Sequence, residues 1–89
     1  MNDEKTYLIY AGSYEQFRFC VRENNINPKK VVYVHRALDV FGRVPKHTVI
    51  IKFGTWYENR DDSAITAELE LLKRRGAEEI NLPESEETK

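Results

Sequence analysis

The sequence predicts a small three-layer α/β domain, Rossmann-like, with a mostly parallel sheet of three or four strands and two or three helices. Apolar, β-branched runs alternate along the chain with segments of helical spacing. A Ser-x-x-Gln box at residues 13–16 marks a helix start directly after the first apolar run. The 89 residues are enough for one domain, so we expect residues 1–82 to form it. Residues 83–89 are acidic and have no apolar residue to bury, which predicts a disordered tail.

The first strand and the first helix follow one another closely. Residues 6–11 are apolar, β-branched and aromatic, which predicts a buried strand that stops at Gly12. Ser13 is then expected to cap a helix that runs to about Asn24. Its apolar face has i, i+3, i+4 spacing and contains Phe17, Cys20 and Val21. Asn24-Asn25 suits a left-handed stop, and Pro28 prevents the helix from continuing.

Two further strands are expected at residues 30–34 and 48–53. The first of them is continuously apolar, as strands covered on both faces tend to be, and the second ends at Gly54. Residues 35–47 between them are about the minimum length for a parallel crossover, and residues 37–41 suit one short helical turn. The spacing therefore allows the third strand to be parallel or antiparallel.

The C-terminal part predicts a helix and an edge strand. A helix from about Asp62 to Arg75 begins with acidic residues and ends with basic ones, and Gly76 follows as its C′ residue. Residues 77–82 alternate weakly, as in a short edge strand.

Composition excludes several classes of protein. The chain has 14 Lys and Arg against 15 Asp and Glu, and residues 6–77 carry 12 of the former and 8 of the latter, a net +4. This balance argues against a polybasic nucleic-acid tail. The single Cys20 cannot form an internal disulfide, and no apolar run suits a signal peptide or a membrane span. We therefore expect a soluble, cytoplasmic protein without a membrane partner.

The candidate site lies where the first three strands end. Ligands of open parallel sheets bind outside the carboxyl ends of the strands, where the loops converge. The loops concerned supply glycines, hydroxyls, positive donors and aromatic rings, which together suit an anionic, nucleotide-like ligand. The predicted ligand-binding residues are Gly12, Ser13, Tyr14, His35, Arg36, Gly54, Thr55, Trp56 and Arg60.

Each residue type has a role in this hypothesis. Backbone N–H groups at the start of the first helix are expected to face an anion. Arg36 or Arg60 is expected to bind phosphate through two parallel hydrogen bonds from its guanidinium group. Trp56 or Tyr57 stacks on a base. Adjacent rings in an extended loop cannot both point inward, so one of these two is expected to pack as a lid on the core.

No catalytic residue, cofactor or metal is assigned. The dinucleotide glycine fingerprint and the phosphate-loop pattern are absent, and the Gly-Ser pair at residues 12–13 also suits a plain turn and cap. Asp61 and Asp62 suit helix caps better than metal ligands. The best carboxylate pair for acid–base chemistry is Asp39 with Glu58, which is not enough to predict an enzyme.

The loops at residues 11–17 and 53–61, with the strand at 31–34 between them, resemble small Rossmann-like proteins of unassigned function encoded by tailed bacteriophages. The resemblance implies a phage context, the host cytoplasm and, by kind, sequestration of a nucleotide signal of host defence without hydrolysis.

Two alternatives to nucleotide binding remain open. A protein-binding inhibitor of a host factor would use exposed Trp56, Tyr57 and Tyr14 as anchors. A DNA-associated accessory module would contact phosphates through basic side chains, namely Arg18, Arg22, Lys29, Lys30 and Arg36.

Overall fold

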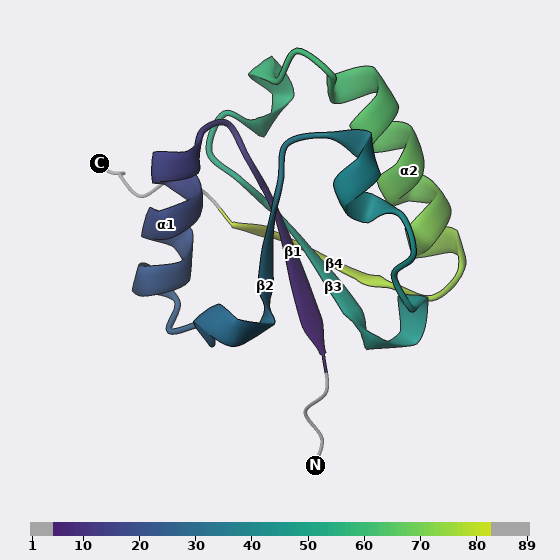
Figure 1. Ribbon diagram of the computed structural model, residues 1–89, viewed down its shortest axis with the longest axis horizontal. Coiled ribbons are helices and arrows are strands. Elements are labelled where there is room, and N and C mark those ends of the chain that lie inside the picture. Colours follow the sequence, from purple (N-terminus) through teal and green to yellow (C-terminus); the bar gives the residue numbers. More distant parts are fainter. Residues whose placement is uncertain (1–4, 83–89) are drawn as a thin grey trace.

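Four parallel strands form the single sheet of this computed structural model, in the order β2-β1-β3-β4 (Figure 1). The structure describes residues 5–82, so the predicted acidic tail lies outside it. The strands are β1 (Thr6–Ala11), β2 (Val31–Val34), β3 (Thr48–Phe53) and β4 (Glu78–Leu82). The helices are α1 (Tyr14–Glu23) and α2 (Asp62–Arg74), with four short 3₁₀ turns, η1 (Pro28–Lys30), η2 (Ala37–Val40), η3 (Pro45–His47) and η4 (Trp56–Glu58). The predicted α/β fold with a parallel sheet is confirmed.

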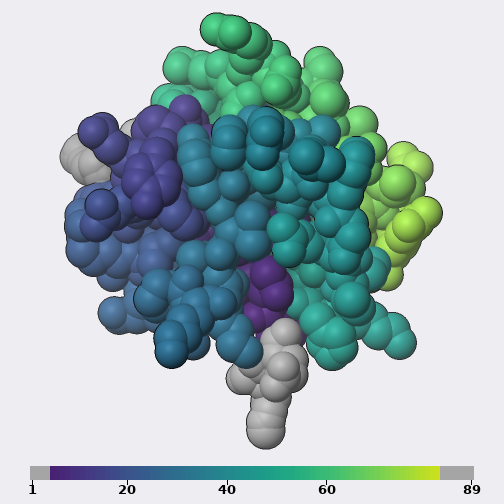
Figure 2. Space-filling view, in the orientation of Figure 1, coloured from purple at the N-terminus to yellow at the C-terminus, as the bar shows by residue number. Residues whose placement is uncertain are grey.

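Strand β1 lies in the middle of the sheet. It pairs with β2 on one side, Tyr10 opposite Val34, and with β3 on the other, Ala11 opposite Phe53. The third strand is therefore parallel, and the antiparallel alternative is wrong. The chain reaches it through η2 and η3, whose segment forms the teal part of the molecular face seen in Figure 2.

The sheet separates two apolar layers, because alternate side chains of each strand point to opposite faces. One layer lies beneath α2 and η2, and the other beneath α1 (Figure 1). The first contains Leu8, Tyr10, Val34, Val40, Ile50, Ile65, Leu69 and Leu72. The second contains Ile9, Ala11, Phe17, Cys20, Val49, Ile51 and Phe53. The predicted three-layer arrangement is confirmed.

The ends of both helices follow the sequence signals with one exception. Ser13 Oγ accepts the Gln16 N–H at 3.2 Å, Asn25 has a left-handed φ of 53°, and Gly76 has a φ of 117°. Asp61 occupies the N-cap position of α2, but its side chain makes no cap hydrogen bond. The carboxylate of Asp62 instead accepts the buried Tyr10 hydroxyl at 2.6 Å, so capping is the wrong role for it.

Strand β2 is less covered than its composition predicts. Val31, Val32 and Tyr33 are only partly buried, and Val34 alone is fully buried. The expectation of cover on both faces is wrong for this strand because β2 forms the edge of the sheet. Strand β4 forms the opposite edge, as predicted.

No helix within residues 5–82 is both long and apolar enough to cross a membrane. Helix α1 has 10 residues and α2 has 13.

The core beneath α2 provides a matched test of the packing. Leu69 is fully buried, whereas Leu71 on the same helix is 40% exposed. We expect Leu69→Ala to lower the free energy of unfolding by about 2 to 5 kcal/mol, since it opens a cavity. The same change at Leu71 should cost less than about 1 kcal/mol. Urea denaturation of both variants measures this, and equal losses would contradict the packing described.

Candidate functional site at the carboxyl edge of the sheet

The three loops of the predicted site all leave the sheet at one edge. Strands β1, β2 and β3 run parallel, so the turns that follow them begin side by side (Figure 1). These turns and the segment leading to α2 carry all nine predicted ligand residues. The chain goes from β1 outward to β2 and then crosses to β3 on the other side of β1, so the topological switch point, where open α/β sheets bind ligands, lies between β1 and β3.

Gln16 links the first and third of these loops. Its Oε1 accepts the Gly12 N–H at 2.8 Å and the Thr55 N–H at 3.1 Å, and the Thr55 hydroxyl lies 3.4 Å from the same oxygen. Its Nε2 donates to Thr55 Oγ1 at 3.1 Å. We call the point where these donors of Gly12 and Thr55 converge the Gln16 oxygen site. In a standard capping box the Gln16 side chain would accept the N–H of Ser13. Here it accepts the N–H of Gly12 instead.

The two glycines are close to the Gln16 carboxamide. A Cβ on Gly12 would lie 2.8 Å from Gln16 Oε1, and one on Gly54 would lie 2.7 Å from Gln16 Cδ. Real Cβ contacts are essentially never shorter than 3.0 Å. Gly54 also has a φ of 63°, which disfavours any larger residue. Gly12 is required because a Cβ there would also lie 2.8 Å from the backbone carbonyl oxygen of Thr55, and Gly54 is required by its positive φ, since the flexible Gln16 side chain alone could shift.

Aromatic rings connect the first loop with the second. The Tyr14 and Tyr33 centroids are 5.6 Å apart, Phe17 and Tyr33 are 5.1 Å apart, and Tyr33 and His35 stack at 4.8 Å. Tyr14 is 56% exposed, so it presents a ring to solvent. The structure thus places predicted residues Tyr14 and His35 on one aromatic cluster, joined by Tyr33.

Asp39 fixes the turn that follows β2. Its Oδ2 accepts the N–H groups of His35 and Arg36, both at 3.1 Å, and lies 3.4 Å from His35 Nδ1. The Arg36 guanidinium is 3.9 Å from Oδ1 and remains largely exposed, as does Arg60. Asp39 thus supports the loop, and the two arginines are accessible to a ligand.

Trp56 packs inward and its neighbour Tyr57 does not. The Trp56 ring lies 5.6 Å from the buried Tyr10 ring, and Lys52 Nζ lies 4.5 Å from its centroid. Tyr57 is 57% exposed. The prediction that one of the two covers the core is confirmed, and the residue is Trp56.

Buried charges hold β4 beside this region. Lys52 Nζ lies 3.7 Å from Glu79, and Lys73 Nζ lies 2.7 Å from the other oxygen of Glu79. The Lys52 and Glu79 side chains are only 10% and 13% exposed. Burial alone would raise the pKa of Glu79, but the ammonium groups of Lys73 and Lys52 outweigh it and hold that pKa below its usual value.

Sequence reasoning missed three residues of this arrangement. Gln16 was recognised only as part of a cap, although a side chain at the third helical position can also reach the preceding loop. Lys52 is a lone charge in an apolar strand, which signals a buried ion pair. Tyr33 alternates with Val34, so its ring faces α1 rather than η2.

The site is rich in hydrogen-bond donors. Within residues 5–82, no three His, Cys, Asp or Glu side chains lie close enough to hold a metal ion. The Cys20 thiol is fully buried, and burial raises its pKa to about 11. Burial and the hydrogen bond to Asp62 also raise the pKa of the Tyr10 hydroxyl. The accessible groups can therefore bind an anionic oxygen, while these buried groups stay protonated near neutral pH.

The lowered pKa of Glu79 predicts a pH-dependent stability. Its carboxylate favours the folded state at neutral pH, and this contribution is lost as the pH falls from about 4.3 through the lower folded pKa. We expect Glu79→Gln to cost about 2 kcal/mol at pH 7 and progressively less below pH 4. The control Glu78→Gln removes an exposed carboxylate and should cost less than about 0.5 kcal/mol. Denaturant titrations from pH 2.5 to 7 test this, and a Glu79→Gln cost independent of pH would refute it.

The chain matches no protein-family model, no curated protein and no solved structure in the comparisons made. The resemblance to small phage proteins therefore stays an expectation from loop and strand patterns.

Proposed function

We propose that this protein binds an anionic, nucleotide-like ligand at the carboxyl edge of its sheet and releases it unchanged. One observation carries the proposal. Two backbone N–H groups and a hydroxyl, from loops 43 residues apart, converge on a single acceptor, the Gln16 oxygen. Donors arranged in this way suit a phosphate oxygen, since hydrogen bonds to an ionised acceptor are about twice as strong as neutral ones.

A ligand oxygen would replace the Gln16 oxygen rather than enter an empty space. The carboxamide is at the end of a flexible side chain, and rotation of that side chain exposes the N–H groups of Gly12 and Thr55. The start of α1 adds a positive dipole end at the same place. The site therefore favours an anion over the neutral amide that occupies it.

The surroundings suit the other parts of a nucleotide. Arg36 and Arg60 are exposed near the same edge and can pair with further phosphate oxygens. The exposed ring of Tyr14 offers a stacking surface for a base. Trp56 is less suited to stacking than expected, because it already packs on Tyr10 and Lys52.

Binding without turnover follows from the chemistry of these groups. Ser13 Oγ accepts a helix N–H, and the Asp39 carboxylate accepts two backbone N–H groups. His35 Nδ1 lies 3.4 Å from Asp39, but within residues 5–82 neither side chain is hydrogen-bonded to a hydroxyl or thiol that it could activate as a nucleophile. In the phage context that the loop pattern suggests, holding a host defence nucleotide without hydrolysis would be the corresponding role.

A second candidate function is the inhibition of a protein partner. Leu38, Phe41 and Val44 are each more than half exposed on the segment that follows β2. Phe41 also lines a 160 Å³ groove together with the exposed Leu71 of α2. Such side chains are anchors for protein contact, and they differ from the anchors Trp56, Tyr57 and Tyr14 expected from the sequence. Absence of heat with any nucleotide would favour this candidate.

Gln16 variants test the proposed function directly. We expect Gln16→Ala to bind ADP about 10- to 100-fold more tightly than the wild type, because the competing oxygen is gone, while the free energy of unfolding falls by about 1 to 3 kcal/mol. Gln16→Glu should lose ADP binding and keep its stability, because a carboxylate then occupies the donors. Titration calorimetry measures affinity, and chromatography of the recovered ADP measures turnover.

Asn25→Asp is the control for the Gln16 variants, since it adds the same charge at the far end of α1. It should bind ADP as the wild type does. If Gln16→Glu binds ADP equally well, the ligand does not use the Gln16 oxygen site. Recovery of AMP would place the protein among enzymes.

The arginines provide an independent test of the phosphate contacts. Replacing Arg36 or Arg60 with Ala should weaken ADP binding by about 1.5 to 3 kcal/mol, the range for hydrogen bonds to charged groups. The matched control is Arg74→Ala, an exposed arginine at the other end of α2. Similar losses for all three variants in calorimetry would indicate a general charge effect instead of a site.

A further inference from the structure

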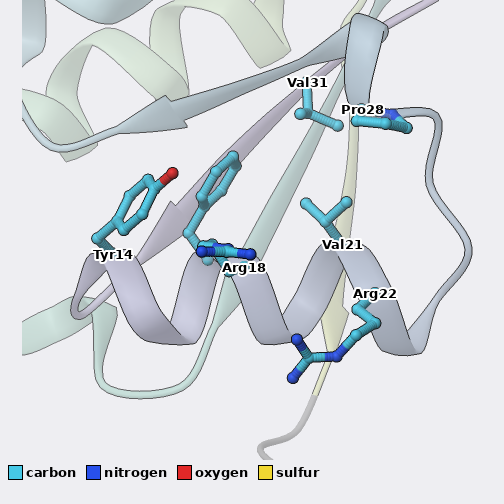
Figure 3. A pocket seen from close by; sticks show the side chains of 7 residues that line it. Tyr14, Arg18, Val21, Arg22, Pro28 and Val31 are labelled. Atoms are coloured by element: carbon cyan, nitrogen blue, oxygen red, sulfur yellow. The ribbon is translucent and has the colours of Figure 1, made fainter.

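A groove of 410 Å³ runs between α1 and the edge strand β2, away from the Gln16 oxygen site. Figure 3 shows side chains of α1 along the groove, with Pro28 and Val31 across from them. Since β2 is the outermost strand, the groove lies at an edge of the sheet and can accept an extended chain. Its lining residues are Tyr14, Phe17, Arg18, Val21, Arg22, Pro28 and Val31.

Two arginines of the groove, Arg18 and Arg22, are not paired with a carboxylate of residues 5–82, although the Arg22 guanidinium carbon lies 5.9 Å from the centroid of the Phe19 ring. Arg18 and Arg22 are exposed, and neither forms an ion pair with a described residue. They are four residues apart on α1, a spacing that places their Cβ atoms about 5 to 6 Å apart and is unfavourable for like charges. An anion bound to both guanidinium groups would remove this repulsion. The pair therefore points to a ligand with closely spaced negative charges.

Aromatic rings continue from the groove toward the carboxyl edge. Tyr14 and Phe17 line the groove, and both contact the ring of Tyr33, which in turn stacks on His35. Tyr14 is more than half exposed, and the His35 side chain is 47% exposed. Two rings of this cluster are thus open to stacking partners.

We propose that the α1–β2 groove binds short single-stranded nucleic acid. Non-specific single-strand sites combine a basic groove that follows the backbone with rings on which bases stack, and both features are present. From Tyr14 to Arg22, α1 rises about 12 Å. Phosphates recur about every 3.4 Å along a strand in a duplex, and at longer intervals in a stretched chain, so the groove accommodates two to four nucleotides. In a duplex the bases stay stacked inside the double helix, so their faces are not accessible to the Tyr14 and His35 rings.

This inference does not depend on the proposed function. Gln16 contacts Thr55 after β3, whereas Tyr14 and Phe17 contact Tyr33 on β2, and β1 lies between these two strands. The Gln16 oxygen site and the two groove arginines therefore lie on different sides of β1 and can be altered separately, whereas Tyr14 belongs to both proposed sites.

The test is fluorescence anisotropy of a labelled single-stranded dT hexamer with purified protein at low and moderate salt. We expect the double variant Arg18→Gln/Arg22→Gln to weaken binding at least tenfold and to reduce the salt dependence by about one to two phosphate contacts. Tyr14→Ala should weaken binding about 5- to 100-fold through loss of one stacking surface.

The matched control is Arg74→Gln/Arg75→Gln, which removes the same charge from exposed positions at the end of α2. It should change hexamer binding less than twofold, and denaturant titration should show that all variants are folded. Gln16→Glu should leave hexamer binding unchanged even where it abolishes ADP binding, which separates the two sites.

Three results would overturn the groove assignment. The wild type fails to bind the hexamer, the Arg74→Gln/Arg75→Gln control loses as much affinity as the groove variant, or a hexamer of Glu binds as tightly as the dT hexamer. The last result would assign the groove to an acidic peptide.

Discussion

Every loop of the candidate site is positioned by one strand, β1, which hydrogen-bonds to β2 on one side and to β3 on the other. The chain passes from β2 across the middle of the sheet to reach β3, and the parallel register fixes where each following turn begins. Residues 12 and 54 thereby come close enough for one glutamine to bond both loops. Without the parallel β1–β3 pairing, the N–H groups of Gly12 and Thr55 would not converge on Gln16. The close approach at residues 12 and 54 would then be absent as well.

The two sides of β1 differ in how firmly their side chains are held. Toward β3, the Tyr10–Asp62 hydrogen bond, the Trp56 ring and the Lys52–Glu79 ion pair form contacts that tie η4, α2 and β4 together. Toward β2, rings and guanidinium groups stand at an open sheet edge with few polar partners. A rigid side suits a site of defined geometry, whereas an open side suits a ligand of variable sequence and shape.

The sequence allowed most of the fold to be predicted, because apolar runs and caps are local signals. The strand at residues 48–53, the helix start at Ser13 and the glycine end of α2 are where the patterns place them. The direction of the third strand could not be predicted, since it depends on a long-range pairing and the 35–47 segment fits either direction.

The candidate site was predictable only as a set of loops. Parallel topology brings Gly12 and Thr55 together once it is known, but the bonds of Gln16 to both depend on one side-chain rotamer. Asp62 accepts a hydrogen bond from Tyr10 in place of its predicted capping role. This bond likewise joins residues 52 positions apart. Spacing along the chain contains no information about contacts of that range.

The hydrogen bonds of Gln16 also have a kinetic consequence. If they stabilise the closed arrangement by about 1.5 to 3 kcal/mol, roughly 1 to 10 per cent of molecules have the Gly12 and Thr55 donors uncovered at any moment. The apparent affinity of any competing anion is then about 10- to 100-fold weaker than its affinity for the open state. Brief encounters with abundant small anions would mostly meet a closed surface. A ligand that also contacts groups beyond the Gly12 and Thr55 donors could stay nearby until the Gln16 carboxamide rotates away. Gln16 would therefore favour larger ligands because they remain at the site longer, and not because of their shape.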